Sequence, residues 1–338
     1  MTPLVIPIFI AHQGCPHRCI FCDQHTITGH SREEAQEVSP EGVKATIGNW
    51  LQRPRRLGKA EVQVAFYGGS FTGLPLQRQK ELLGSVQSYI EAGQVDSIRI
   101  STRPDYLNDV IIDLLQDYSV TVVELGIQSL DQEVLDASVR GHSVQQAEDA
   151  VCLLKKSGFT VGAQLMCGLP GDNTPRLAAT AKKTAALAPD FVRIYPVLVI
   201  KGSVLEKNYR AGNYRPLSLA RAVALCTRMK TIFDQHNIKV VRMGLQTSEE
   251  LADKVVAGPY HPAFGELVMA RIIFNKSRKV LGAKYKKQKK HLSIAAADES
   301  VFRGPDNVSM KRLAALGLLH GIELVFDKEQ PRNTVWVY

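Results

Sequence analysis

The chain has 338 residues, of which 45% are hydrophobic and 22% are charged. These values are ordinary for a globular protein whose core is formed by one large domain or two. No apolar run approaches the roughly 20 residues that a membrane-spanning helix needs, and a strand expected close to the N-terminus leaves no room for a cleaved targeting segment. We therefore expect a soluble, cytoplasmic protein, whose net charge of +9 permits an anionic partner without requiring one.

From residue 1 to about residue 242, short β-rich runs alternate with amphipathic helical runs. The β-rich runs predict six strands, at residues 5–10, 62–67, 97–101, 121–126, 160–166 and 191–195. Among the helical runs, residues 76–90 have one apolar face, Ser143 and Gln146 can form a capping box, and residues 219–233 carry an apolar stripe. Such alternation implies parallel strands with right-handed crossovers. Because no G-x-G-x-x-G and no P-loop lysine follows a strand, we predict an α/β fold with a partial, TIM-like (β/α)6 barrel over residues 1–242.

Three cysteines follow the first expected strand: Cys15, Cys19 and Cys22, with the spacing C-x3-C-x2-C. A structural zinc site and an electron-carrying 4Fe–4S cluster each require four protein ligands. Three thiolates around a four-iron cluster leave one iron open to a substrate or cofactor. One alternative is a Cys3His zinc site completed by His25. A disulfide is a weaker alternative, because clustered cysteines in a cytosolic chain usually bind metal or do chemistry.

Glycine and polar residues gather where the later strands are expected to end. The segments are residues 68–72, 101–105, 126–129, 167–171 and 195–196. A single glycine pair would be an ordinary turn signal. All five segments, however, lie at C-terminal ends of parallel strands, the face on which barrel enzymes place their active sites. Together with the cysteine loop they indicate one site.

The cysteine spacing, with Phe21 directly before the third cysteine, resembles that of the radical S-adenosylmethionine (SAM) superfamily. The resemblance implies a radical SAM barrel with one 4Fe–4S cluster on the three cysteines, SAM at the open iron, and reductive cleavage of SAM to a 5′-deoxyadenosyl radical. It also implies an external one-electron donor of the flavodoxin or ferredoxin type. Gly68 and Gly69, followed by Ser70, match the glycine motif that superfamily members place against the SAM amino group.

Further SAM contacts are implied by a resemblance to the oxygen-independent coproporphyrinogen oxidases. Gln128 and Arg140 are separated by the same interval as two SAM-binding residues of that family, which implies that they bind the methionyl carboxylate region. Gln164 stands where that family has a ribose-binding acid. Phe9, six residues before Cys15, matches an aromatic residue that packs on SAM, and a core strand position is the alternative for it.

A longer resemblance runs through residues 1–240. Segments 68–72, 102–105, 123–129, 140–142, 168–171 and 194–202 are similar to the radical SAM half of the catalytic subunit of Elongator, which modifies wobble uridines in tRNA using acetyl-CoA. The chain is therefore identified as a member of an Elongator-like branch of radical SAM proteins. It differs from Elongator in its shorter cysteine loop, in the absence of an acetyltransferase domain after the barrel, and in Ser101, which replaces a glutamate. The wobble-uridine activity is therefore not carried over, and the SAM contact expected at Ser101 is altered.

Several other residues at this face are candidates for the chemistry. Tyr195 and Lys201 belong to the resembling segment 194–202 and are expected to contact substrate, with a solvated loop lysine as the alternative for Lys201. Cys167 precedes Gly-Leu-Pro-Gly and is a candidate hydrogen-atom donor. Cys152 and Cys226 are expected to be buried helix residues.

Residues 243–338 are predicted to form a small α+β cap domain. Thr247 and Glu250 can cap a short helix through residue 256, and residues 261–266 resemble the C-terminal domain appended to this branch. A helix is expected near residues 307–316, and strands at 322–326 and 334–338. Five lysines stand within seven residues without an acid: Lys284, Lys286, Lys287, Lys289 and Lys290. They belong either to a solvated loop or to a site for RNA phosphates.

The leading functional hypothesis is a radical SAM enzyme that modifies RNA, and tRNA bases in particular. A small metabolite or cofactor precursor is the alternative substrate. A zinc-dependent RNA-binding module without catalysis is least favoured, because the strand-end motifs and the missing fourth thiolate argue against it.

Overall fold

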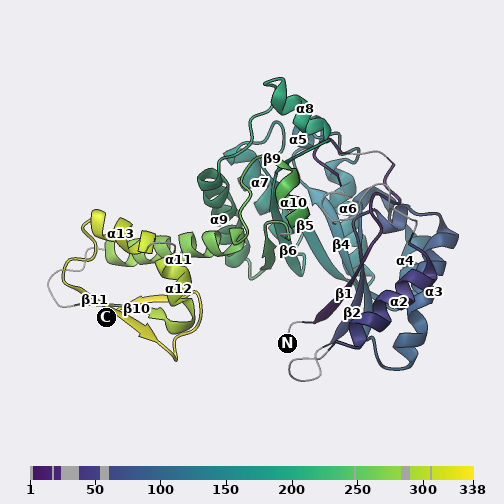
Figure 1. The fold of residues 1–338 in the computed structure, drawn as a ribbon, viewed down its shortest axis with the longest axis horizontal. Coiled ribbons are helices and arrows are strands. Elements are labelled where there is room, and N and C mark those ends of the chain that lie inside the picture. Colours follow the sequence, from purple (N-terminus) through teal and green to yellow (C-terminus); the bar gives the residue numbers. More distant parts are fainter. Residues whose placement is uncertain are drawn as a thin grey trace.

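The computed structural model describes residues 3–16, 19–23, 38–53, 61–246, 249–282, 290–304 and 307–338, with the backbone alone at residues 249, 250 and 290. Two units follow each other along the chain (Figure 1). The first is a curled parallel sheet with helices on its outer side, and the second is a small sheet with helices of its own. No helix in these described ranges is long and apolar enough to cross a membrane.

The first unit is built on a seven-stranded sheet with the order β1-β2-β3-β4-β5-β6-β8, parallel throughout. Its strands are β1 (Leu4–Phe9), β2 (Val62–Tyr67), β3 (Ser97–Thr102), β4 (Val120–Gln128), β5 (Thr160–Cys167), β6 (Phe191–Pro196) and β8 (Lys239–Met243). This half-barrel confirms the predicted α/β fold class. The sequence reasoning missed β8 because this last strand is partly exposed and its burial alternates, so it lacks a continuous apolar run.

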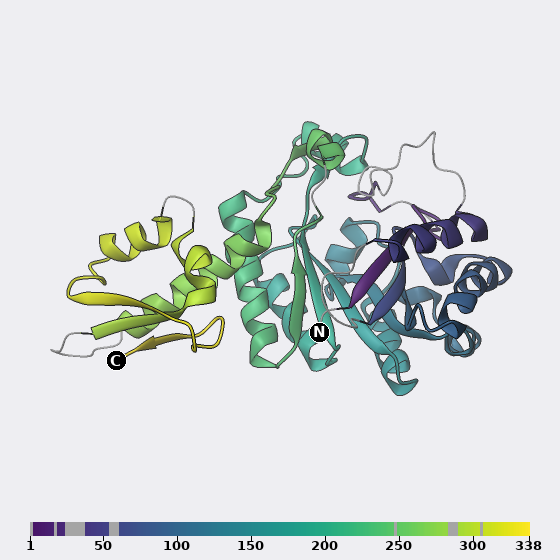
Figure 2. The ribbon, with the colours of Figure 1, turned by 60° about the horizontal axis from the view of Figure 1, so that its bottom comes forward.

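Helices between the strands cover the convex side of the sheet (Figure 2). They are α2 (Pro40–Leu51), α3 (Leu76–Glu91), α4 (Asp109–Asp117), α6 (Val144–Lys156), α7 (Thr174–Ala186) and α9 (Leu219–Gln235). The short helix α5 (Gln132–Ala137) instead packs through Val134 against Ile20 of the cysteine loop and Leu169 after β5. The capping box of Ser143 and Gln146 is present at the start of α6. Short polar caps begin other helices in the same way, for example Asn108 before α4 and Asn173 before α7.

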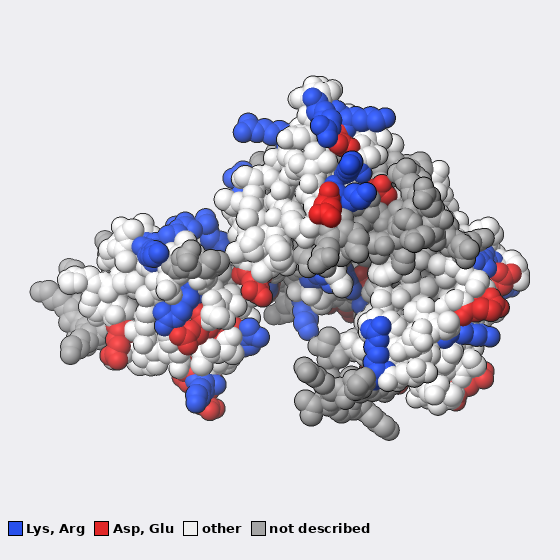
Figure 3. All heavy atoms as spheres, viewed as in Figure 1, with Lys and Arg blue, Asp and Glu red and all other residues white. Residues whose placement is uncertain are grey.

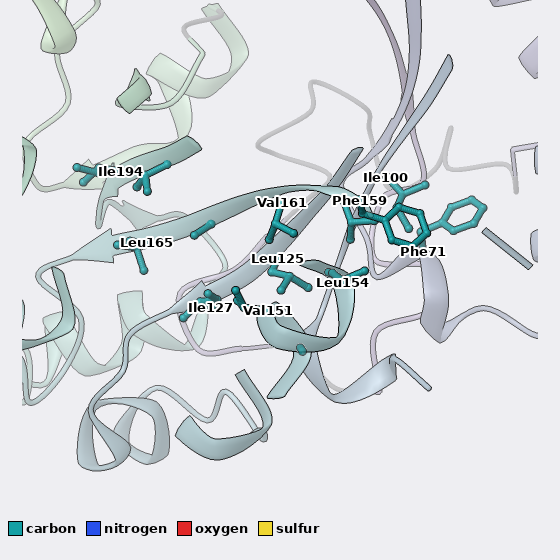
Figure 4. Packing of buried hydrophobic residues seen from close by; sticks show 14 of the residues in the cluster. Phe71, Ile100, Leu125, Ile127, Val151, Leu154, Phe159, Val161, Leu165 and Ile194 are labelled. Atoms are coloured by element: carbon teal, nitrogen blue, oxygen red, sulfur yellow. The ribbon is translucent and has the colours of Figure 1, made fainter. Parts of the chain in front are cut away.

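The main core lies between these helices and the sheet. In Figure 4, Val151 and Leu154 of α6 lie beneath Leu125 and Val161 of the sheet. Side chains in a strand alternate between its two faces, so every second residue enters this core. The residues between them face the concave side, where they surround a cavity. Each strand therefore contributes residues both to the hydrophobic core and to the lining of the cavity.

Two cysteines that were expected to be buried in helices lie in different environments. Cys152 is exposed, because the buried face of α6 is formed by Ala147, Ala150, Val151 and Leu154. The expectation that Cys152 is buried was therefore wrong. Cys226 is buried in α9, as expected.

The second unit surrounds a three-stranded sheet with the order β11-β10-β12. Its elements are α11 (Phe264–Gly282), β10 (Lys290–Ala295), α12 (Glu299–Arg303), α13 (Val308–Ala315), β11 (Ile322–Asp327) and β12 (Val335–Val337). Strand β10 is parallel to β11 and antiparallel to β12. The predicted α13, β11 and β12 are present, whereas α11 and β10 were not foreseen. The boundary at residues 242/243 stays a prediction, since α11 packs against both α9 of the first unit and the helices of the second.

A short connection between the units corrects another expectation. Helix α10 (Glu249–Lys254) ends at Lys254, and β9 (Val255–Ala257) follows it at once. The helix predicted to run through residue 256 is shorter because β9 pairs antiparallel with β7 (Val199–Ile200). Its predicted cap Thr247 lies outside the described residues, as do Lys284, Lys286, Lys287 and Lys289, and the side chain of Lys290.

Candidate active site

A cavity of about 800 Å³ lies in the concave side of the sheet and opens toward the C-terminal ends of the strands. Most of the predicted site residues line it. These are Phe9, Cys15, Cys19, Phe21, Cys22, Gly68, Gly69, Ser101, Gln128, Arg140, Gln164 and Tyr195. Phe9 follows the alternation of β1 into the cavity, while Ile6, Ile8 and Ile10 enter the core. Residues far apart in the chain are thus brought to one place by the parallel sheet.

The cysteine loop is held against the glycine loop that follows β2. Ser70 donates its backbone N–H to the carbonyl of Gln13 (2.9 Å), and His12 donates to Gly68 (2.9 Å). A Cβ on Gly69 would lie 2.4 Å from the Gln13 oxygen and 2.5 Å from the Ile10 oxygen. Gly69 is therefore required for the two loops to touch, whatever ligand the site holds.

The second half of the cysteine loop is anchored by Ile20, which is buried. Its N–H donates to the carbonyl of Ser138 (3.3 Å), and its carbonyl accepts from the N–H of Leu205 (2.8 Å). Ser138 stands two residues before Arg140. These contacts bring Cys19 close to the Arg140 guanidinium, whose Nη1 is 3.4 Å from the Cys19 Sγ.

Ser70 does not line the cavity, although it was predicted to bind the cofactor. Its side chain is fully buried, with Oγ 3.1 Å from the Thr102 hydroxyl, and it accepts a bond from the Arg103 N–H (3.3 Å). The hydroxyl therefore joins the loop after β2 to the loop after β3. Its part in the site is to position these two loops.

Arg140 is oriented by the end of β4. Its Nη2 donates to the carbonyl of Gly126 (2.7 Å), and a Cβ at Gly126 would lie 2.8 Å from this nitrogen. Gln128, two residues further on, has a φ of 66°, a left-handed conformation that non-glycine residues rarely adopt and that often marks functional sites. The strand end is thus shaped around the Arg140 guanidinium and the Gln128 amide.

A second arginine at the cavity was not predicted as a site residue. Arg103 forms a two-pronged ion pair with Asp105, with Nε to Oδ1 at 2.9 Å and Nη2 to Oδ2 at 2.7 Å. Burial raises the pKa of the Cys15 thiol, and the positive charges of Arg140 and Arg103 oppose that rise. The arginines therefore favour the thiolate, the form in which cysteine binds metal.

Three buried polar atoms around the mouth have no hydrogen-bond partner among the described residues. They are Arg103 Nη1, Arg140 Nε and Gln128 Oε1. Buried polar groups are nearly always paired, so unpaired ones at a cavity indicate a missing ligand. Two cationic donors and one acceptor, beside three thiols, fit a thiolate-bound cluster together with a ligand that carries a carboxylate and an amino group.

His25, the fourth ligand of the alternative zinc site, lies outside the described residues. Within the described ranges no three His, Cys, Asp or Glu side chains form a group that could hold a metal ion. Since this finding covers Cys15, Cys19 and Cys22 as well, the positions of the thiols do not by themselves distinguish the zinc alternative from a cluster.

The floor of the cavity is organised by Glu124 of β4, which is fully buried. Its carboxylate binds one side chain from each of four other strands. These are Tyr67 of β2 (3.0 Å), Arg99 of β3 (3.0 Å), Gln164 of β5 (3.1 Å) and Arg193 of β6 (2.9 Å). Gln164 also donates to the Ser101 hydroxyl (3.3 Å). The sequence contained a signal for this group, since Arg99, Glu124 and Arg193 are charges inside otherwise apolar strands.

The two candidate substrate contacts are placed differently. Tyr195 lines the cavity on the inner face of β6, and burial raises the pKa of its hydroxyl. Lys201 is exposed and is not among the residues that line the cavity, as expected for a solvated loop lysine. Cys167 points to the opposite face of β5, is buried in the core and lies against Cys226. That position offers no support for a role as hydrogen-atom donor.

Comparison with known families agrees with this geometry. The model of the radical SAM superfamily matches residues 9–183, and that of the radical SAM C-terminal domain matches residues 189–273. The chain therefore belongs to the radical SAM superfamily, whose enzymes use a 4Fe–4S cluster and SAM. Its relatives place it in the Elongator-like branch.

Three relatives illustrate this placement. An uncharacterised protein of Methanocaldococcus jannaschii is 32% identical over 65% of this chain and 69% of its own length. The tRNA uridine(34) acetyltransferase of the same organism is 28% identical over 78% of this chain and 54% of its own length. Mouse Elongator complex protein 3 is 25% identical over 79% of this chain and 55% of its own length. The chain thus spans about half the length of the latter two proteins.

Two solved structures share the fold. The archaeal Methanocaldococcus infernus Elp3, with an N-terminal deletion, aligns with a TM-score of 0.60 and 23% identity, over 84% of this chain and 65% of that one. Coproporphyrinogen III oxidase from Escherichia coli aligns with a TM-score of 0.50 and 18% identity, over 70% and 53%.

The contact between the cysteine and glycine loops can be tested with Gly69→Ala. The added methyl group would collide with two backbone carbonyls, so the cysteine loop must move and iron incorporation should fall severalfold. Gly48→Ala is the matched control. Gly48 lies inside α2, and no neighbouring atom stands within 4 Å of the position that its added methyl group would take. This control should therefore keep the iron content and add about 0.5–1 kcal/mol of stability. Wild-type iron content in Gly69→Ala would contradict the assigned role of the loop contact.

Proposed function

We propose that this radical SAM enzyme modifies RNA, with a tRNA base as the substrate. It holds a 4Fe–4S cluster through Cys15, Cys19 and Cys22. The observation that supports the cofactor assignment is that these three cysteines line one cavity together with Arg103, Arg140 and Gln128, each of which has an unpaired buried polar atom. When bound, the reduced cluster and SAM supply a 5′-deoxyadenosyl radical by reductive cleavage of SAM.

The chain's own residues orient SAM in this proposal. Arg140, with Arg103 beside it, binds the methionyl carboxylate through the unpaired Nε of Arg140 and the unpaired Nη1 of Arg103, because hydrogen bonds between a guanidinium and a carboxylate are charge-assisted. Gln128 accepts a bond through its unpaired Oε1, and the backbone at Gly68 and Gly69 faces the amino group.

The ribose and adenine are held by the remaining lining residues. Gln164 and Ser101 serve the ribose hydroxyls. The Gln164 amide nitrogen is already used by Glu124 and Ser101, which leaves its carbonyl oxygen for a sugar hydroxyl. Phe9 and Phe21 provide apolar surface for the nucleoside.

The substrate enters beyond SAM and meets Tyr195, with Lys201 contacting it outside the cavity. An external donor of the flavodoxin or ferredoxin type delivers the electron. RNA is favoured as substrate by the tRNA-directed names of two relatives and by the nine Lys and Arg residues, without an acid, between Arg271 and His291. Acetyl transfer is not part of the proposal, because the similarity covers only about half of those relatives.

A small acidic metabolite is the second candidate. Arg193 and Arg242 both line the cavity, and the one carboxylate of Glu124 is shared by two arginines, Arg99 and Arg193, so positive charge is left for a small anion. A small acidic metabolite would be bound by positive charges inside the cavity, whereas RNA would be bound by positive charges outside it.

The cluster assignment predicts about four irons per chain after anaerobic reconstitution. Replacing Cys15, Cys19 or Cys22 by Ala should abolish the cluster and the release of 5′-deoxyadenosine from SAM under reducing conditions. Cys152→Ala, at an exposed helix position, should change neither. Iron analysis and chromatography of the products measure both. Stoichiometric zinc with no iron after reconstitution would overturn the assignment in favour of the Cys3His site.

The proposed carboxylate contact is tested by Arg140→Ala and Arg140→Lys. Loss of a charge-assisted bond costs roughly 1.5–3 kcal/mol, so Arg140→Ala should weaken SAM binding about 10- to 150-fold. Lysine keeps the charge but not the planar, oriented N–H groups of arginine, so Arg140→Lys should fall between that variant and the wild type. Equilibrium binding of SAM to the reconstituted protein is the measurement. Unchanged affinity in Arg140→Ala would show that SAM lies elsewhere.

RNA binding is tested by changing the five lysines Lys284, Lys286, Lys287, Lys289 and Lys290 to Ser. If each contacts a phosphate of unpaired RNA, log affinity should fall with log salt with a slope about 3–4 units steeper in the wild type than in the variant. Binding of unfractionated tRNA at several salt concentrations gives both slopes. Equal slopes would remove these lysines from the RNA site. Absence of wild-type binding at low salt would favour the small-metabolite candidate.

A further inference from the structure

Three arginines form a row on the helices of the C-terminal unit. Arg271, Phe274 and Arg278 follow the i, i+3, i+7 spacing that places residues on one face of α11. Arg312 of α13 crosses to that face, with its Cζ 4.7 Å from the centre of the Phe274 ring. Helices α11 and α13 pack against each other at this point. Arg312 thus joins the face of α11 that carries Arg271 and Arg278.

This arginine row has no compensating acid. None of the three forms an ion pair with a carboxylate anywhere in the described ranges of the chain. Burial and the neighbouring charges of Arg312 and Arg278 lower the pKa of Arg271. Figure 3 shows Lys and Arg side chains gathered over α11 and α13, on the upper edge of this unit. Uncompensated like charges repel one another in the free protein, and an anionic partner would relieve that repulsion.

The spacing of the row indicates the kind of anion. Seven residues of helix separate Arg271 from Arg278, which is about 10 Å along the axis. One compact anion cannot satisfy charges spread over that length, whereas a polymer that presents phosphates in series can. Arginine also suits phosphate better than lysine does, because its planar group donates in pairs.

We propose that the arginine row binds the phosphate backbone of the RNA substrate and holds it beside the barrel. The inference rests on the proposed function, since it takes RNA as the substrate. Arg278 and Arg312 lie beyond residue 273, where the match to the family's C-terminal domain ends. Two members of the row, Arg271 and Arg278, also precede the lysine-rich segment closely in the sequence, because α11 ends at Gly282 and the first of the five lysines is Lys284. Arg312 follows that segment along the chain and reaches the other two arginines through the packing of α13 on α11.

The test uses the full-length, reconstituted protein and fluorescently labelled unfractionated tRNA. The triple variant Arg271→Gln, Arg278→Gln, Arg312→Gln should bind tRNA at least tenfold more weakly at about 100 mM salt, with a salt slope shallower by about 2–3. The corresponding triple Arg→Lys variant keeps the charge and should keep the slope within about one. Thermal melting and iron content of the Gln variant show whether the unit is folded, and the Lys variant distinguishes charge from packing over Phe274.

A matched control removes the same charge elsewhere. Lys80, Lys156 and Lys182 are exposed on α3, α6 and α7 of the barrel, and their replacement by Gln should leave the slope at the wild-type value. If the wild type binds tRNA and the two Gln variants have equal salt slopes, the arginine row does not bind RNA. The proposed function would then still stand. Failure of the wild type to bind tRNA would overturn both. If the protein binds phosphatidylglycerol vesicles through these arginines and does not bind tRNA, the row is a site for a membrane surface. That result would overturn its assignment as an RNA site.

Discussion

The architecture of the site depends on one buried carboxylate. Glu124 joins side chains from five consecutive strands across the concave side of the sheet, from Tyr67 of β2 to Arg193 of β6. A buried charge is tolerated only when it is fully paired, and here two guanidinium groups, an amide and a phenol complete its hydrogen bonds. The pairing fixes the direction of Gln164 and Arg193, so the cavity floor is set before any ligand binds.

Above this floor, the charged side chains at the cavity mouth favour an anionic ligand. Arg103 and Arg140 stand at the cavity mouth beside Cys15 and Cys19, and each retains a buried N–H or NH2 group without a partner among the described residues. The same two cations that favour the Cys15 thiolate are available to a carboxylate. His142 stays neutral in this setting, since burial and the nearby Arg140 lower its pKa to about 3. The mouth therefore carries positive charge that does not vary near neutral pH.

The C-terminal unit carries a second group of positive charges, outside the barrel. Its small sheet buries Leu292 and Ile294 with Phe302 and Leu313, a core separate from that of the barrel. Helix α11 belongs to both units, because it packs on α9 at one end and on α12 and α13 at the other. A shared helix resists independent movement of the two parts more than an extended linker would. Basic groups on this unit are thereby held near the barrel that bears the cavity.

Much of the barrel followed from sequence alone. The six predicted strands are all present, with ends within two residues of those observed, because parallel strands buried on one face and facing a cavity on the other carry long β-branched runs. The cysteine spacing and the strand-end motifs likewise indicated one site, and the resemblance to the coproporphyrinogen oxidases added Gln128, Arg140 and Gln164, which line the same cavity. Both signals are local in the chain, and the C-terminal ends of parallel strands necessarily meet at one edge.

The tertiary structure decided what depends on side-chain direction and on distant contacts. Alternation along the strands directs Phe9 and Tyr195 into the cavity and Cys167 into the core. Cys152 is exposed because it does not belong to the face of α6 that packs on the sheet. Ser70, predicted to bind the cofactor, does not line the cavity, and its buried hydroxyl joins two loops. Arg103 and Glu124 line the cavity and were not predicted as site residues. Pairing between β7 and β9 shortened α10, and the arginine row arose only where α13 crossed α11. The sequence by itself determined the fold and the cofactor class, because those depend on local patterns. The tertiary structure decided which side chains each charged group contacts, since partners such as Tyr67 and Arg193 are 126 positions apart in the chain.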